Sequence, residues 1–201
     1  MIRLLLADDQ ALVRGALAAL LGLESDLEVV AQVGRGDEVV AAAVEHRAEV
    51  CLVDVEMPGL DGIEVCRALA THAPGARSLV VTTFGRPGYL RRALEAGASG
   101  FVVKDTPAAE LADAVRRVHA GLRVVDPSLA TESLLGGANP LTERERDVLR
   151  AALAGSPVAQ IARSVHLSPG TVRNYLSSAI GKTHTSTRAQ AAATARDRGW
   201  L

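Results

Sequence analysis

Residues 4–10 read LLLADDQ, an apolar run that ends abruptly in two adjacent carboxylates. The three leucines and the alanine favour the end of a buried strand, and Asp8 and Asp9 follow it directly. Adjacent carboxylates repel each other and are poorly hydrated beside a core. Their position therefore indicates a function, which the rest of the chain must explain.

Apolar, β-branched runs like this one recur along the first hundred residues, and helical patterns separate them. The runs are IRLLLA, LEVVAQV, VCLVDV, RSLVVTT and GFVVK. Alternation of strand and helix predicts a parallel sheet with helices on both faces, whose strands are almost continuously apolar because both of their faces are covered. We therefore predict an α/β fold with a five-stranded, doubly wound sheet.

Composition excludes several classes of protein. The chain has 201 residues, of which 48% are hydrophobic and 22% charged, so it is globular rather than disordered. No apolar run approaches the ~18 residues of a membrane span, and the short apolar start is no signal peptide. Cys51 and Cys66 lie inside core-like segments without metal-ligand spacing. We expect a cytoplasmic protein that does not insert into membranes.

Charge divides the chain into two modules. Residues 1–139 carry a net charge of −6, whereas residues 140–201 carry +5. The periodic pattern lapses between them in a stretch rich in Gly, Pro and Ser. We predict a first domain over residues 1–120, a linker over 121–139 and a second domain over 140–201, with different partners for the acidic and basic parts.

The second domain shows no strand pattern and several helix start signals. Its helices follow one another closely, which predicts a small all-α domain. Thr142 with Glu145 forms a capping-box signal, and Ser-Pro pairs indicate an N-cap followed by the first helical residue. These pairs are Ser156-Pro157 and Ser168-Pro169.

Polar residues follow four of the predicted strands at the point where each ends. They are Asp8 and Asp9, Asp54, the pair Thr82-Thr83, and Lys104. The carboxyl ends of parallel strands share one edge of a sheet, where ligands bind. Three carboxylates about 4 Å apart would cost on the order of 4 kcal/mol per pair at an effective dielectric of 20, and a divalent cation removes that cost. Oxygen-only ligands favour Mg²⁺.

Together these groups form a set suited to phosphoryl transfer. A carboxylate attacks phosphorus, while a metal and a lysine neutralise phosphoryl oxygens and a hydroxyl donates to one of them. Asp61, in the turn MPGLDG, is better interpreted as a turn or cap residue.

Residues 1–120 resemble a response-regulator receiver domain. The motifs are ADD, LVDVEMPGLDG, VVTT and GFVVKD. The resemblance implies a flavodoxin-like sheet and phosphorylation of Asp54 by a sensor histidine kinase. It also implies that Asp9, Asp54 and the backbone carbonyl of Glu56 bind Mg²⁺ directly, with Asp8 holding a metal-bound water.

The same resemblance implies a switch. Thr82, rather than Thr83, matches the hydroxyl that follows the phosphoryl group, Lys104 closes on that group, and Phe101 matches the aromatic that swings inward with it. Asp105 stands where many receivers have proline. Phosphorylation is then expected to promote a homodimer, for which we expect the first and fifth receiver helices to pair.

The spacing on the third helix of the basic domain predicts two faces. Val172, Leu176 and Ala179 would pack inward. The opposite face would carry Arg173, Asn174 and Ser177, side chains suited to reading bases in double-stranded DNA. Lys182 and Arg188 lie towards or beyond the helix end, where phosphates are the expected targets. The tight HLSPG connection into this helix is typical of a helix-turn-helix.

This domain resembles the LuxR-type helix-turn-helix over LTERERDVLRAALAG and IARSVHLSPGTVRNYLSSAIGK. With the receiver, the chain resembles the NarL/FixJ family of response regulators over nearly its whole length. Thr183 departs from the apolar residue usual in the family, which predicts a less firmly packed end of the recognition helix. The resemblance implies a transcription factor controlled by phosphorylation, not an enzyme.

Three other functions compete with this interpretation. A flavodoxin-like enzyme or nucleotide-binding protein would need a glycine-rich phosphate loop after the first strand, where ADDQALVRG has acids instead. A regulator that acts without phosphorylation would not need the full Asp, Thr and Lys set. The third alternative is a protein-interaction adaptor. Binding of heparin or bulk DNA by the fragment from Pro140 onward would distinguish a DNA-binding regulator from such an adaptor.

Overall fold

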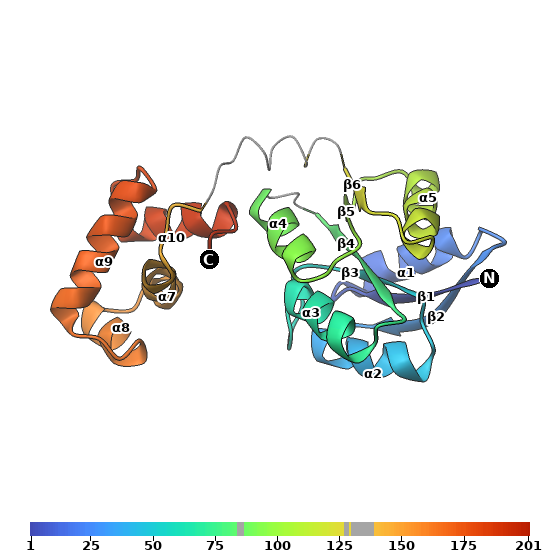
Figure 1. Cartoon of the computed structure of the whole chain (residues 1–201), viewed down its shortest axis with the longest axis horizontal. Coiled ribbons are helices and arrows are strands. Elements are labelled where there is room, and N and C mark those ends of the chain that lie inside the picture. The colour runs from blue at the N-terminus through green and yellow to red at the C-terminus, as the bar shows by residue number, and fades with distance from the viewer. Residues whose placement is uncertain (84–86, 127–128, 130–138) are drawn as a thin grey trace. The chain divides into compact units, whose positions relative to one another are not determined.

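The computed structural model describes residues 1–83, 87–126, 129 and 139–201 of the chain. It divides into two compact units (Figure 1). The first contains Met1–Gly85 and Tyr89–Glu132, and the second contains Arg86–Gly88 and Ser133–Leu201. Each unit has its own hydrophobic core, so each is described by itself.

The first unit is built on a parallel sheet whose strand order is β2-β1-β3-β4-β5-β6. Its strands are β1 (Ile2–Ala7), β2 (Leu27–Val33), β3 (Val50–Val53), β4 (Arg77–Thr82), β5 (Gly100–Val103) and β6 (Val124–Val125). The chain reverses direction across the sheet between β1 and β3, which pair in parallel register from Leu4 with Val50 to Ala7 with Val53. This is the switch point of a doubly wound sheet, as the sequence predicted.

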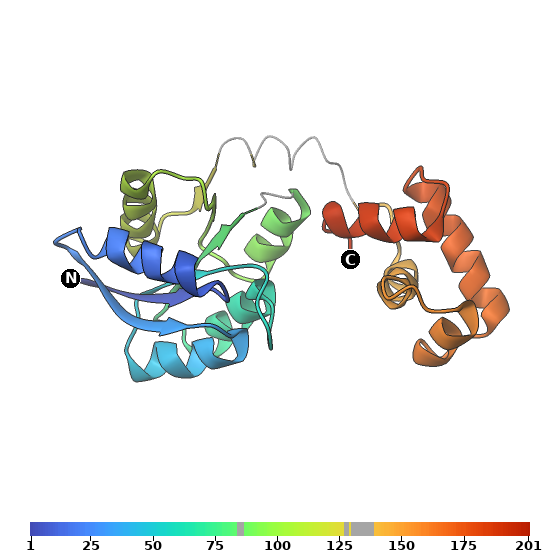
Figure 2. The ribbon, with the colours of Figure 1, turned by 180° about the vertical axis from the view of Figure 1, so that it is seen from behind.

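Helices cover both faces of this sheet (Figures 1 and 2). They are α1 (Ala11–Leu21), α2 (Gly36–Glu45), α3 (Gly62–His72), α4 (Pro87–Glu95) and α5 (Ala108–His119). Leu4 and Leu6 of β1 pack in one core with side chains of α1 and α5. Leu5 and Ala7 pack in another with side chains of α2 and α3. Successive strand residues point to opposite faces, which explains why β1 is apolar throughout.

The α/β fold class is confirmed, and the structure adds a sixth strand to the five predicted. Val124 and Val125 pair in parallel with Gly100 and Phe101 of β5. These two valines lie within the segment predicted as a linker, most of whose remaining residues fall outside the described ranges. A two-residue strand carries no periodic signal, so the sequence pattern missed it.

The second unit is all-helical, as predicted. Its helices are α7 (Glu143–Ala152), α8 (Val158–Ser164), α9 (Pro169–Lys182) and α10 (Arg188–Asp197). Thr142 and Glu145 form the predicted capping box of α7, and Ser168 caps α9 through the backbone N–H of Thr171. The prediction for α8 was wrong by one residue, because Pro157 rather than Ser156 is the N-cap. Proline offers no side-chain acceptor there.

Candidate phosphorylation site and DNA-reading face

The pairing of β1 with β3 brings the predicted carboxylates together. The backbone N–H of Asp54 donates to the carbonyl of Ala7 at 2.8 Å, which places Asp54 beside the end of β1. One carboxylate oxygen from each of Asp8, Asp9 and Asp54 lies within 4.8 Å of the others. Asp8 and Asp54 are buried, whereas Asp9 is exposed. The acidic cluster predicted from strand ends is therefore present.

Lys104 lies between the two buried carboxylates. Its Nζ is 2.7 Å from Asp8 Oδ2 and 2.9 Å from Asp54 Oδ2, and only 10% of its side chain is exposed. The other Asp54 oxygen, Oδ1, accepts the backbone N–H of Val55 at 2.7 Å. Sequence reasoning placed Lys104 at this edge but did not anticipate that a single ammonium is shared by two aspartates.

The pKa values of Asp54 and Lys104 are both raised, which disfavours the charged form of Asp54 and favours the charged form of Lys104. Burial raises the pKa of Asp54, and hydrogen bonding to Lys104 opposes that rise without cancelling it. Burial would lower the pKa of Lys104, but hydrogen bonds to Asp8 and Asp54 raise it. The asymmetry arises because the lysine has two anionic partners, whereas Asp54 shares its cation and faces the like charge of Asp8. Lys104 is thus held firmly as a cation.

Thr82 ends β4 beside the residue Lys104, whereas Phe101 lies within β5, where it pairs with Val80. Thr82 is 5% exposed, and its carbonyl accepts the backbone N–H of Lys104 at 2.8 Å. The neighbouring Thr83 is exposed, which agrees with the preference for Thr82. Phe101 is completely buried in a core with Ile63 and side chains of α4. The structure thus places Thr82 at the edge that carries Asp54, while the switch role of Phe101 stays a prediction.

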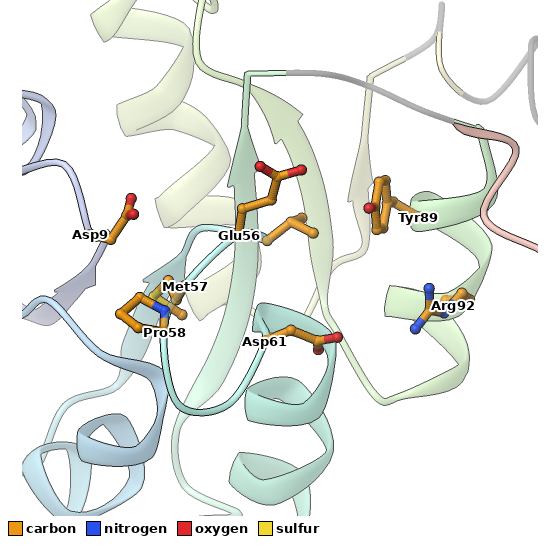
Figure 3. Close-up of a pocket in the computed structure, with 8 residues that line it drawn as sticks. Asp9, Glu56, Met57, Pro58, Asp61, Tyr89 and Arg92 are labelled. Atoms are coloured by element: carbon orange, nitrogen blue, oxygen red, sulfur yellow. The ribbon is translucent and has the colours of Figure 1, made fainter. Parts of the chain in front are cut away.

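A pocket of about 450 Å³ opens beside the cluster (Figure 3). Asp9 and the loop after β3 form one side, and Tyr89 and Arg92 of α4 form the other. Its lining is Asp9, Val55, Glu56, Met57, Pro58, Asp61, Tyr89 and Arg92. Tyr89 and Arg92 were missed by sequence reasoning, because no strand end or motif marks them. Asp61 has the predicted cap role, since it forms a capping box with Glu64 on α3.

The donor set fits a hard divalent cation. The three clustered aspartates offer only oxygen, and no His or Cys belongs to the cluster. Oxygen ligands in small number suit Mg²⁺, which keeps several waters, better than Zn²⁺, which favours nitrogen and sulfur. Exposed Asp9 leaves one side of the cluster open to solvent. Asp8, Asp9 and Asp54 are therefore the residues that could hold a metal ion.

The recognition helix α9 has the two faces that its sequence predicts. Val172, Leu176 and Ala179 are buried against the other helices of the second unit. Arg173, Asn174 and Ser177 are exposed. The three exposed side chains form a surface rich in hydrogen-bond donors, which is what an α-helix needs in order to read the major groove.

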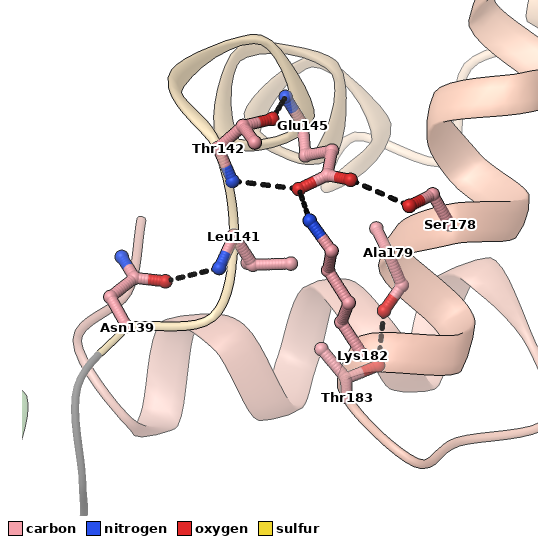
Figure 4. A network of polar contacts seen from close by, with 8 residues as sticks. All are labelled: Asn139, Leu141, Thr142, Glu145, Ser178, Ala179, Lys182 and Thr183. Carbon is pink, nitrogen blue, oxygen red and sulfur yellow. Dashed lines mark hydrogen bonds and ion pairs between the residues drawn. The ribbon is translucent and has the colours of Figure 1, made fainter.

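Lys182, drawn in Figure 4, and Arg188 differ from the exposed set because both have partners inside the unit. Lys182 Nζ is 2.8 Å from Glu145 Oε2. Arg188 Nη1 donates to the carbonyl of Ser156 at 3.1 Å. Their contact with DNA phosphates stays a prediction, and Lys182 is considered again below.

Thr183 does not loosen the end of α9. It is 7% exposed, and its hydroxyl donates to the carbonyl of Ala179 at 2.8 Å. It also lies 3.0 Å from the hydroxyl of Thr185. The expectation of a less firmly packed helix end was wrong, because Thr183 is buried and its hydroxyl adds a second hydrogen bond to the Ala179 carbonyl, which also accepts the backbone N–H of Thr183 at 2.9 Å.

Comparison with known families decides what these two sites belong to. Residues 4–116 match the response regulator receiver domain, and residues 139–195 match the bacterial regulatory proteins of the luxR family. The chain belongs to the response regulators. Members with this pair of domains are DNA-binding transcriptional regulators and not enzymes, which confirms the reading of the sequence.

Several relatives match this response regulator from end to end. It is 41% identical over 201 residues to the uncharacterized transcriptional regulatory protein YvfU, and 40% identical over 201 residues to the transcriptional regulatory protein DesR, both from Bacillus subtilis (strain 168). These alignments cover 100% of each chain. The crystal structure of the response regulator ChrA, from a heme-sensing two-component system, matches with a TM-score of 0.60 and 32% identity, covering 100% of this chain and 98% of that one.

Among the described residues, no helix is both long enough and apolar enough to cross a membrane.

Proposed function

We propose that this response regulator is switched by phosphorylation of Asp54 by a sensor histidine kinase, with Mg²⁺ bound by Asp9, Asp54 and the backbone carbonyl of Glu56 and with Asp8 holding a metal-bound water. The observation that carries this proposal is the position of the Asp54 carboxylate. It lies within the acidic cluster, against the Lys104 ammonium, and beside a pocket open to solvent. The substitution Asp54→Asn tests it most directly.

The proposed reaction is an in-line phosphoryl transfer. An oxygen of the Asp54 carboxylate attacks the phosphorus of a phosphohistidine, the new O–P bond forms as the P–N bond breaks, and the imidazole leaves with a proton from solvent. Lys104 neutralises charge on the phosphoryl oxygens and Thr82 donates a hydrogen bond to one of them. Mg²⁺, when bound, neutralises the remaining charge. Phe101 is expected to follow Thr82 as the site closes.

Replacement of Asp9 by alanine is expected to weaken Mg²⁺ binding. At ten times its Kd, Mg²⁺ stabilises a protein by about 1.4 kcal/mol, which raises the Tm of a domain this size by roughly 5 °C. Asp9→Ala should lose most of that rise. Without the metal it should be at least as stable as wild type, because one repulsive charge is gone. Thermal melts with and without Mg²⁺ measure both effects.

The matched control for this experiment is Asp113→Ala, which removes an exposed carboxylate of α5 outside the cluster. It should keep the wild-type response to Mg²⁺. An equal Mg²⁺-dependent rise in wild type and Asp9→Ala would show that Asp9 is not a metal ligand.

An apolar surface on α1 supports dimerisation. Leu12 is 86% exposed and Leu23, just beyond the helix, is 81% exposed, and Leu20 lies on the same face at 45%. The helix has a single charged residue, Arg14, whose guanidinium donates to the carbonyl of Asp8 at 2.5 Å. The exposed face of α1 is therefore apolar, and the helix is tied to the acidic cluster. We propose that phosphorylation promotes a homodimer through α1 and its neighbour α5.

Leu12→Asp is expected to reduce this dimerisation. A charge placed on an apolar contact surface should raise the Kd of the phosphorylated dimer about tenfold or more. The monomer should keep its stability because the side chain is exposed. Sedimentation of protein treated with acetyl phosphate measures the shift. Val44→Asp is the control, since Val44 is 58% exposed on α2, a helix of the opposite face. A wild-type dimer Kd in Leu12→Asp would argue against this surface.

We further propose that Arg173 and Asn174 read base edges, that Ser177 contacts a base edge or a phosphate, and that Arg188 contacts phosphates. The phosphate contact predicted for Lys182 is replaced by another role in the next subsection. Arg173→Ala removes a bidentate base contact, so the preference for operator over random DNA should fall by a factor that corresponds to about 1–3 kcal/mol. Affinities for both duplexes over a range of salt concentrations measure this preference. Arg196→Ala, an equal charge change at an exposed position of α10, serves as the control. Equal weakening of both duplexes by Arg173→Ala, with a changed salt slope, would mean a phosphate contact instead.

The predicted boundaries complete the proposal, with a receiver over residues 1–120, a linker over 121–139 and a DNA-binding domain over 140–201. The first residues of this linker include β6, which joins the receiver sheet. Cytoplasmic localisation is supported by two free, buried cysteines, Cys51 and Cys66. Burial raises the pKa of the Cys51 thiol to about 12, so it is inert at neutral pH.

A further inference from the structure

The capping box of α7 differs from the other two boxes described in this chain. Asp61 with Glu64 caps α3, and Thr187 with Gln190 caps α10, and in both the residue that closes the box is exposed. Glu145, which closes the box of α7, is only 3% exposed. A charged side chain is almost never buried this far unless it is paired, so capping alone does not explain the burial.

Glu145 also holds the recognition helix (Figure 4). Its Oε1 accepts the hydroxyl of Ser178 at 2.7 Å, and its Oε2 accepts Lys182 Nζ at 2.8 Å and the backbone N–H of Thr142 at 2.7 Å. Ser178 and Lys182 lie four positions apart and therefore on one side of α9. One carboxylate thus ties the start of α7 to two successive turns of α9.

Two attachments on successive turns restrict rotation of α9 about its own axis. A rotation of about 20° moves a side chain at a radius of ~6 Å by roughly 2 Å. Hydrogen bonds to base edges fail over such a distance, since good geometry spans only a few tenths of an ångström. Attraction to phosphates falls off slowly with distance and tolerates the same shift. A loosened α9 would therefore lose base preference before it loses general affinity for DNA.

We propose that Glu145 is a positioning residue for DNA reading and that Lys182 acts through it rather than as a phosphate contact. Lys182 is already neutralised by Glu145 and holds no free counterion. Substitution of Lys182 should therefore change the number of ions released on DNA binding very little. Burial alone would raise the pKa of Glu145, but hydrogen bonds from Lys182, Ser178 and Thr142 hold it at about 2, so the carboxylate remains charged wherever DNA binding is measured. This inference rests on the proposed base reading by Arg173 and Asn174.

The test uses the full chain with acetyl phosphate and Mg²⁺ present throughout. One probe is a duplex selected by the wild-type protein from a random pool, and the other is the same duplex with its sequence shuffled. The variants are Glu145→Gln, Lys182→Met and the combination of both. Gln closes the natural capping box of α10, so Glu145→Gln keeps the cap and removes the charge. Gln190→Ala is the control, because it breaks an exposed box in the same unit.

Each single variant should reduce the preference for the selected duplex about tenfold, within the range of one lost base contact. Affinity for the shuffled duplex should stay within about twofold, and the salt slope should change by less than about 0.5. The combined variant should be no worse than the poorer single variant, because the two residues act as one unit. Gln190→Ala should keep the wild-type preference.

Two outcomes would overturn the inference. Lys182→Met could weaken both duplexes alike and lower the salt slope by about 1, which identifies a phosphate contact. Alternatively, a folded Glu145→Gln protein could keep the wild-type preference. If circular dichroism shows that Glu145→Gln is unfolded, Ser178→Ala and Lys182→Met carry the test, since both leave the cap of α7 intact. Failure of the base-reading proposal itself is recognised separately, because Arg173→Ala would then leave the preference unchanged.

Discussion

Asp54→Asn protein is expected to take up no phosphoryl group from acetyl phosphate and Mg²⁺ under conditions in which wild type takes up one. Asparagine has almost the same shape, but its amide oxygen is a far weaker nucleophile than a carboxylate oxygen. The substitution also removes the negative charge that Lys104 contacts at 2.9 Å. Intact-mass measurement and phosphate-affinity gels report the gain of a phosphoryl group directly.

Asp61→Asn is the matched control for this experiment. Asp61 lines the same pocket but caps α3, and asparagine is an equally good N-cap. Asp61→Asn should therefore be labelled like wild type. Labelling of Asp54→Asn at the wild-type rate would mean that another carboxylate is the phosphoacceptor and would refute the proposed function of the cluster.

The second large effect is expected from Lys104→Met. This change leaves Asp8 and Asp54 buried without their shared cation, and breaking a buried ion pair by removing one partner costs about 3–5 kcal/mol. Methionine keeps most of the aliphatic part of the side chain. The decrease in the free energy of unfolding therefore measures mainly the removal of the positive charge. Mg²⁺ should restore part of the loss, because it neutralises the same carboxylates. Urea denaturation with and without Mg²⁺ measures both quantities.

The cost of Lys104→Met should depend on pH. Burial raises the pKa of Asp54 above its usual 3.8 even with Lys104 present, and removal of the ammonium should raise it further. Between 3.8 and this raised pKa the folded protein binds more protons than the unfolded chain, so stability increases as the pH falls. The difference between Lys104→Met and wild type should be largest at neutral pH and shrink towards pH 4.

Arg35→Met provides the comparison for a surface ion pair. Arg35 and Asp37 form a hydrogen-bonded pair whose side chains are 49% and 47% exposed, and such pairs contribute about 0–1 kcal/mol. Arg35→Met should therefore cost little and show no comparable dependence on pH between 4 and 7. If Lys104→Met were as mild, the buried carboxylates would not depend on Lys104 for neutralisation.

Much of the fold and part of the site could be predicted because their signals are local. Apolar runs followed by Asp8, Asp54 and Lys104 indicate strands and their carboxyl ends, and the topology of a parallel sheet then brings those ends to one edge. The two faces of α9 follow from helical spacing in the same way. Each of these patterns is complete within a few residues, so the amino-acid sequence by itself determined the two-domain organisation, the acidic cluster and the exposed position of Arg173.

Other features depend on how separate elements meet, and only the tertiary structure decided them. Lys104, which follows β5, bridges two aspartates because β1 and β3 end side by side, in register at Ala7 and Val53, so that Asp8 and Asp54 are neighbours. Tyr89 and Arg92 line the pocket only because α4 packs beside the loop that follows β3. Glu145 has the same capping signal as Glu64, yet it contacts Ser178 and Lys182, which are 33 and 37 positions away. A capping motif specifies where a helix starts, whereas the crossing of α7 with α9 determines which distant side chains its carboxylate reaches.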